Sequence, residues 1–192
     1  GPELELRVGE DDAVLPGDRL GAGVDVQGDL YAGVAETIGN DLFVSTLVNN
    51  GQTCHLSSRI LAPRSRYAEI VDAVAALADG LTVGDPLDKA TDIGPLVSAR
   101  QQQRVLDYID IGKSEAKLVA GGSVPAGQSR GWYVSPTVFA DVDNSSRIAQ
   151  EEVFGPVLTV IPYDTDQQAI EIANDSEFGL GGTVWTTDPD RG

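Results

Sequence analysis

The most constraining feature of this sequence is an alternation of strand-like and helix-like segments along most of its length. Short apolar runs predict strands at residues 58–62, 117–120, 133–139, 157–163 and 183–186. Apolar residues at helical spacing predict helices at 37–48, 65–80, 98–112 and 165–173. Strands that alternate with helices are joined by crossover connections, which favours a largely parallel sheet with helices on its faces. The predicted fold class is therefore α/β.

Polar residues at three of the predicted helix starts support these boundaries. Ser65 precedes one helix and is a residue type that caps helix amino termini. Ser98 with Gln101, and Thr165 with Gln168, have the spacing of a capping box. We expect all three hydroxyls to act as caps.

The first 36 residues have a different character from the rest. Gly1–Pro2 is typical of the pair left when a purification tag is cleaved. The residues that follow read as short strands broken by turns, including an extended stretch from Asp25 to Gly33. We therefore predict a β-rich N-terminal extension at 1–36, of uncertain origin, followed by the main domain at 37–192.

Charge and hydropathy narrow the classes of partner. The chain has 13 Lys and Arg against 30 Asp and Glu, a formal net charge of −17, which disfavours nucleic acid and anionic membranes as partners. No apolar run approaches the ~20 residues that span a bilayer, and no secretory signal is evident. With 41% hydrophobic residues the chain can form a globular core. A cytoplasmic protein is expected.

The single cysteine, Cys54, lies in a polar, glycine-containing turn just after the predicted 37–48 helix. One cysteine cannot form an internal disulfide, and an inert core cysteine normally lies among aliphatic residues. A turn of this kind can direct backbone N–H groups at the sulfur or at an oxyanion, which favours a thiolate and its attack on a carbonyl group. The sequence thus predicts a nucleophile for covalent, acyl-type chemistry.

Several ordered motifs resemble the aldehyde dehydrogenase family. They are Asn50–Cys54 with Arg59–Ile60, Gly84–Pro86, Asp92–Leu96, Gly121–Gly122, Trp132–Val138, Glu151–Val157, and Asn174 with Gly179–Leu180. The short cysteine motif alone is only moderately specific, whereas the ordered set is hard to obtain by chance. The resemblance covers residues from about Thr37 to Gly192.

The resemblance implies a reaction and roles for three residues. Cys54 resembles the nucleophile that attacks an aldehyde, giving a thiohemiacetal that transfers hydride to NAD or NADP and leaves a thioester for water to hydrolyse. Glu152 resembles the residue that hydrogen-bonds the nicotinamide ribose, and Phe154 would line the cofactor end of the site. The family also implies a homo-oligomer, and no metal is expected.

Plainer interpretations compete at the neighbouring positions. Glu151 is read as a solvated neighbour, because adjacent side chains in an extended chain point opposite ways. The same alternation disfavours His55 as a base that activates the thiol. Trp132 and Trp185 could line a substrate tunnel, but strand aromatics are more often packing residues.

The sequence also departs from the family. A Rossmann-like cofactor domain and its oxyanion-hole asparagine have no match. The general-base segment Glu-Leu-Gly-Gly-Lys should fall near residues 19–23, where the chain reads Arg-Leu-Gly-Ala-Gly. We therefore expect a domain truncated at its C-terminus that is weakly active or inactive alone, unless another chain supplies the missing domain. The alternative is a non-catalytic assembly or protein-binding module with a vestigial site.

Overall fold

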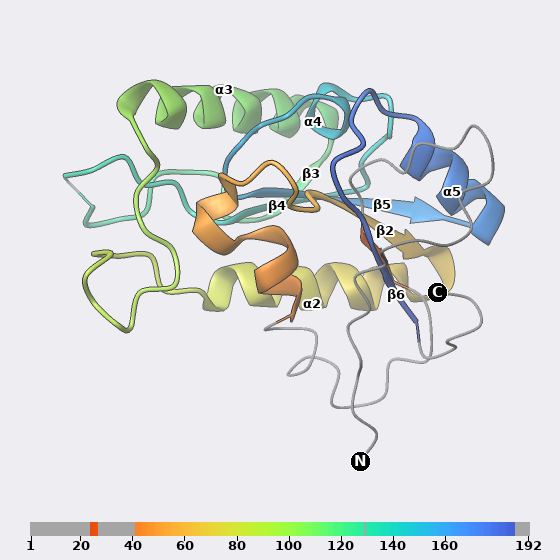
Figure 1. Ribbon diagram of the computed structural model, residues 1–192, viewed down its shortest axis with the longest axis horizontal. Coiled ribbons are helices and arrows are strands. Elements are labelled where there is room, and N and C mark those ends of the chain that lie inside the picture. The colour runs from red at the N-terminus through yellow and green to blue at the C-terminus, as the bar shows by residue number, and fades with distance from the viewer. Residues whose placement is uncertain (1–23, 27–40, 129, 187–192) are drawn as a thin grey trace, which may run out of the picture.

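Parallel strand pairing organises the chain, as seen in a computed structural model that describes residues 24–26, 41–128 and 130–186 (Figure 1). The strands are β1 (Val24–Val26), β2 (Arg59–Pro63), β3 (Lys117–Ala120), β4 (Thr137–Ala140), β5 (Val157–Tyr163) and β6 (Thr183–Trp185). Within these residues they form one sheet in the order β3-β4-β5-β2-β1-β6. Only the β3–β4 pairing in this described part is antiparallel. The predicted α/β class with a largely parallel sheet is confirmed.

Helices cover both faces of this sheet (Figure 1). They are α2 (Tyr67–Gly80), α3 (Ala99–Glu115), α4 (Arg147–Gln150) and α5 (Asp166–Asn174), with 3₁₀ turns η1 (Val48–Gly51) and η2 (Arg64–Arg66) and helical residues 41–46. Figure 1 shows α2 on one face and α3 on the other, with α4 and α5 on the α3 side. No helix in the described residues is long and apolar enough to cross a membrane.

The core is divided between the two faces because side chains alternate along buried strands. Leu61 of β2 and Ile161 of β5 are register partners and belong to the cluster under α3, α4 and α5. Their neighbours Ile60 and Val160 also pair, and they belong to the opposite cluster with α2 and the 41–46 helix. The largely apolar sequences of β2 and β5 therefore reflect burial on both faces of the sheet.

The predicted caps were right at two helices and wrong at one. The hydroxyls of Ser98 and Thr165 accept hydrogen bonds from the backbone N–H groups of Gln101 and Gln168. Ser65 is not a cap, because η2 takes up residues 64–66 and Arg66 precedes α2 without a side-chain cap bond.

The strand predicted at 133–139 begins only at Thr137, where β4 starts. The preceding residues bond elsewhere: the Ser135 N–H donates to the Ser123 carbonyl, and the Tyr133 carbonyl accepts from Gln102 of α3. Loop and helix contacts thus replace sheet pairing there.

The predictions for the N-terminal segment are only partly covered by the structure. β1 overlaps the expected extended stretch at 25–33 and lies between β2 and β6. Residues 1–23 and 27–40 lie outside the described part of the chain. The division at residue 36 stays a prediction.

Pairing of β2 with β5 brings two loops together at the amino ends of these strands. Arg59 pairs with Thr159, so the loop before each strand leaves the sheet at the same edge. Cys54 precedes Arg59 by five positions, and Phe154 precedes Thr159 by five. The sheet itself therefore juxtaposes the cysteine loop with the Glu-Glu-Val-Phe-Gly turn.

Candidate active site

The cysteine loop, residues 47–56, changes direction through three consecutive left-handed residues. Asn49, Asn50 and Gly51 have φ values of 54°, 60° and 70°. Glycine adopts this region without steric cost, and asparagine tolerates it better than most residues. The loop ends the 41–46 helix and delivers Cys54, which is exposed, ahead of β2.

The glutamate turn, residues 151–155, faces the cysteine loop from the start of β5. Phe154 is also left-handed, with φ 58°, and Gly155 is buried against Val105 of α3. A β-carbon on Gly155 would lie 2.5 Å from Cγ2 of Val105, so only glycine allows α3 this close. The turn therefore packs between α3 and the cysteine loop.

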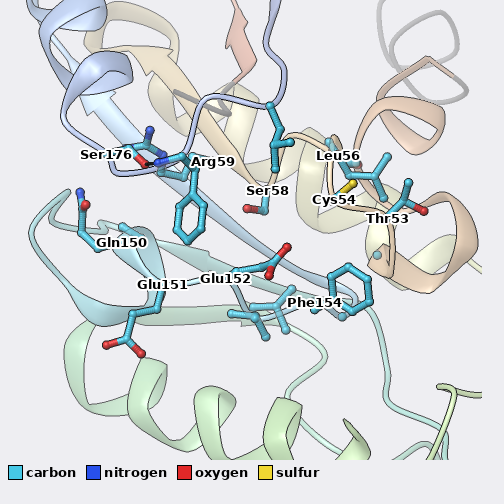
Figure 2. A pocket seen from close by; sticks show the side chains of 18 residues that line it. Thr53, Cys54, Leu56, Ser58, Arg59, Gln150, Glu151, Glu152, Phe154 and Ser176 are labelled. Carbon is cyan, nitrogen blue, oxygen red and sulfur yellow. Dashed lines mark hydrogen bonds between the residues drawn. The ribbon is translucent and has the colours of Figure 1, made fainter. Parts of the chain in front are cut away.

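The two glutamates of this turn point in different directions (Figure 2). The Glu152 carboxylate is exposed and extends toward Ser58 and the cysteine loop. Glu151 extends away and accepts hydrogen bonds from Arg147 at 2.9 and 3.0 Å and from the Tyr108 hydroxyl at 2.5 Å. Hydrogen bonds from Arg147 and then Tyr108 lower the pKa of Glu151 from its ordinary 4.5 to about 2.

A third segment, residues 176–180, completes a cavity between the two loops. The cavity is lined by Thr53, Cys54, Leu56, Ser58 and Arg59 on the β2 side, by residues 149–155 on the β5 side, and by Ser176, Phe178 and Leu180 after α5. Figure 2 shows Cys54 and Glu152 on opposite sides of this space, with the Phe154 ring beside it. The Cys54 thiol and the Glu152 carboxylate thus share one cavity.

Arg59 bonds to the end of α5, next to the third segment of the cavity at residues 176–180. Its side chain is buried, and its guanidinium donates to Asn144 Oδ1 at 2.7 Å and to the carbonyls of Ile172 and Ala173 at 3.1 and 3.0 Å. These carbonyls belong to the last turn of α5, where backbone acceptors lack helical partners. Burial lowers the pKa of Arg59 from its ordinary 12.5, while the nearby Asp175 opposes this shift.

The residues singled out in the sequence fall in different places. Cys54, Glu152 and Phe154 all line the cavity. His55 is exposed and does not line it, and Cys54 and His55 lie in a turn rather than in extended chain. Glu151 lines one end but is engaged by Arg147. In the described residues no group of three or more His, Cys, Asp or Glu could hold a metal ion.

Sequence reasoning missed the residues that support the loops. Arg59 begins an apolar strand, and a charged residue at such a position signals a buried polar contact, so this residue could have been found. Gln101 and Arg104 of α3 gave no such signal, because polar residues on a surface helix are ordinary. Their partners in the glutamate turn become visible only in three dimensions.

The arrangement can support covalent chemistry on a carbonyl compound next to a hydroxyl-bearing ligand. An exposed thiol on a turn can attack a carbonyl carbon while a backbone N–H of the same turn stabilises the oxygen. An exposed carboxylate can accept two hydrogen bonds from neighbouring hydroxyl groups, such as those of a ribose.

Comparisons with known proteins agree with this description. A model of the aldehyde dehydrogenase family matches residues 33–192. Geranial dehydrogenase from Castellaniella defragrans is 57% identical over 148 residues, 77% of this chain and 31% of that protein. Betaine aldehyde dehydrogenase from Rhizobium etli is 46% identical over 145 residues, 74% of this chain and 30% of that protein.

A solved structure shows the same fold. Aldehyde dehydrogenase from Mycobacterium tuberculosis in complex with NAD+ superposes with a TM-score of 0.83 at 50% identity, and the match covers 91% of this chain and 36% of that one. The chain therefore spans about a third of the length of the proteins that it matches.

Proposed function

The chain belongs to the aldehyde dehydrogenase family, and we propose that it forms the nucleophile-bearing part of an enzyme that oxidises an aldehyde to a carboxylic acid. The observation that carries this proposal is the cavity shared by the Cys54 thiol and the Glu152 carboxylate. Each lies just before one of two paired parallel strands, so the sheet fixes their relative position.

In the proposed reaction Cys54 first forms a covalent adduct. Its thiolate attacks the carbonyl carbon, a C–S bond forms, and the carbonyl electron pair moves to oxygen, where the Cys54 N–H helps to hold the charge. Loss of hydride from the thiohemiacetal carbon re-forms the C=O bond and leaves a thioester. Water then adds to the thioester, the C–S bond breaks, and the carboxylic acid departs as the thiolate is restored and one proton passes to solvent.

The glutamate turn suits the nicotinamide end of a dinucleotide. NAD or NADP, when bound, supplies the hydride acceptor. Glu152 presents an exposed carboxylate that would accept hydrogen bonds from ribose hydroxyls, and Phe154 would border the same site. The NAD+ complex of the Mycobacterium tuberculosis relative supports this cofactor class.

The cavity walls favour an uncharged, apolar aldehyde. Leu56, Phe178 and Leu180 contribute apolar surface near the thiol, as suits the aldehyde named for the geranial dehydrogenase relative. We expect octanal to protect Cys54 from alkylation at lower concentration than betaine aldehyde, because reversible addition to the thiol competes with the alkylating reagent. Equal protection would contradict this preference.

The remaining requirements concern partners and compartment. A homo-oligomer, or another chain that provides a cofactor domain, would complete the site. A reducing compartment such as the cytoplasm would keep the exposed thiol free. A non-catalytic module with a vestigial cysteine is the alternative, and it predicts an ordinary thiol.

The deciding experiment is alkylation of Cys54 by iodoacetamide across pH, followed by mass spectrometry. Cys54→Ser is a complete blank because the chain has one cysteine. At each pH near neutral, alkylation of Cys54 is expected to be faster than that of free cysteine, since thiolate is the reacting form. A rate like that of free cysteine would favour the non-catalytic module.

A further inference from the structure

The left-handed run at residues 49–51 needs external support. A left-handed conformation is unfavourable for a residue other than glycine, and such backbone persists only where its surroundings hold it. Two of the three residues are asparagines, Asn49 and Asn50, so the cost is not removed by sequence alone. The contacts of these side chains show where the support comes from.

Asn50 connects the cysteine loop to a segment 44 and 45 residues later in the chain. Its Nδ2 donates to the Pro95 carbonyl at 3.0 Å, and its Oδ1 accepts from the Gly94 N–H at 2.8 Å. Close by, Gln52 Oε1 accepts from the Val97 N–H at 3.0 Å. Both polar atoms of the half-buried Asn50 are engaged, which favours a supporting role over contact with a reacting group.

The same segment continues directly into α3, and α3 holds the glutamate turn. Gln101 Nε2 donates to the carbonyls of Val153 at 3.2 Å and Phe154 at 2.8 Å. Arg104, one helical turn later, donates from Nη2 to the Glu152 carbonyl at 2.6 Å. Three consecutive carbonyls of the turn are therefore held by two side chains of one helix.

The Gln101 side chain bonds to the glutamate turn in place of the capping-box bond expected at its own helix start. In a capping box the side chain at this position returns to the helix start. Here the Gln101 N–H bonds the Ser98 hydroxyl, but its side-chain amide reaches the glutamate turn instead. The helix start is thus fixed to the same turn that carries Glu152.

We propose that residues 94–104 form a brace between the cysteine loop and the glutamate turn, with Asn50 and Gln101 as the positioning residues at its two ends. The brace sets where Cys54 stands relative to Glu152, although neither Asn50 nor Gln101 touches a substrate. This inference rests on the proposed function, because it assigns the contacts a purpose in that reaction. Reactive groups need placement within about 0.5 Å, which supports of this kind supply.

Glycine substitutions test the first end of the brace. Asn50→Gly keeps the left-handed backbone accessible and removes only the carboxamide. Asn49→Gly is the matched control, because Asn49 is also left-handed but its Nδ2 bonds within the loop, to the Gln52 carbonyl and Thr53 Oγ1, with no other partner among the described residues. We expect Asn50→Gly to slow Cys54 alkylation near neutral pH about three- to tenfold.

Asn49→Gly should have a clearly smaller effect. Equal effects of the two substitutions, or an unaltered rate in Asn50→Gly, would overturn the brace at this end. Circular dichroism reports whether each variant folds. If Asn50→Gly does not fold, Gln52→Ala removes the neighbouring contact to Val97 and is expected to slow alkylation at least about twofold.

Alanine substitutions test the other end. Gln101→Ala removes the bonds to the glutamate turn, whereas Gln103→Ala, in the same helix, removes only a bond to Asp107 on the exposed face. We expect Gln101→Ala to slow Cys54 alkylation at least about twofold and Gln103→Ala to leave it unaltered. Identical rates in the two variants would show that the turn is not coupled to the loop.

The two proposals fail in distinguishable ways. The proposed function is judged on the unaltered chain against free cysteine, and the brace on variants against the unaltered chain. Slow alkylation of Cys54 in the unaltered chain refutes the proposed function. The relative alkylation rates of Asn50→Gly and Asn49→Gly still decide whether the brace exists.

Discussion

Gly51 and Gly155 meet backbone to backbone, with no room for a side chain between them. A β-carbon added at Gly51 would overlap the carbonyl group of Gly155. Gly51 belongs to the cysteine loop and Gly155 to the glutamate turn, so the two chemical halves of the cavity are in direct main-chain contact. Cys54 and Glu152 therefore lie on loops that cannot separate without breaking this contact.

Gly51→Ala should destabilise the protein by about 2–4 kcal/mol, because it combines a left-handed φ of 70° with steric overlap. Gly80→Ala is the matched control: Gly80 ends α2 with nothing within 4 Å of an added β-carbon. We expect it to be neutral or to stabilise by up to about 1 kcal/mol. Urea unfolding measures both, and a Gly51→Ala protein as stable as Gly80→Ala would refute the close contact.

Arg59→Met should cost about 2–5 kcal/mol of unfolding free energy, because the carbonyls of Ile172 and Ala173 would lose a buried donor. Arg64→Met, just after β2, removes an exposed pair with Asp164 and should cost clearly less than Arg59→Met, because solvent screens such a pair. Thermal and urea unfolding of the two variants test this difference. Similar losses of unfolding free energy in the two variants would mean that the segment after α5 is not stabilised by Arg59.

Glu152→Gln should weaken NAD+ binding about tenfold or more, since a hydrogen bond to a charged group contributes roughly 1.5–3 kcal/mol. Glu151→Gln is the control at the adjacent position, because the Glu151 carboxylate points away and is engaged by Arg147. Ligand-observed NMR titration can follow weak binding. If both variants bind NAD+ as the unaltered chain does, Glu152 has no role in holding the cofactor.

Stability should depend on the ionisation of Glu151 in acid. Its folded-state pKa of about 2 lies below the ordinary 4.5, so the folded protein favours the carboxylate. This contribution is complete above about pH 4.5 and is lost as the pH falls toward about 2. The side chain is 41% exposed, so solvent screening keeps the effect small.

Urea unfolding at about pH 5 and about pH 3 should therefore show a smaller drop in stability for Glu151→Gln than for the unaltered protein. High salt should narrow the difference, since it screens the Arg147 partner. An equal drop in unfolding free energy between these pH values in the two proteins would contradict the lowered pKa of Glu151.

The sequence predicted the parts of the fold that depend on local pattern. The strand at 157–163 and the hydroxyl caps Ser98 and Thr165 came out as expected, because apolar runs and capping spacings are local signals. Ser65 misled because an arginine-containing 3₁₀ turn delays the start of α2. Trp132 was expected to pack, yet it is 43% exposed, whereas Trp185 packs against the core cluster under α2.

The candidate site was predicted less completely than the fold. Cys54 and Glu152 carry recognisable chemistry, and their motifs made them visible in the sequence. Asn50, Gln101 and Arg104 act through main-chain carbonyls and N–H groups far along the chain. No residue pattern encodes such partners, because any residue offers the same backbone acceptor.

The equal spacing of Cys54 from Arg59 and of Phe154 from Thr159 has a consequence for changes in chain length. Inserting one residue between Cys54 and Arg59 would displace the sulfur relative to β2 while the glutamate turn stayed in place. Deleting one would shift it the other way. Insertions and deletions should therefore be excluded from these two five-residue intervals, and tolerated in the exposed loops at 85–90 and 123–128.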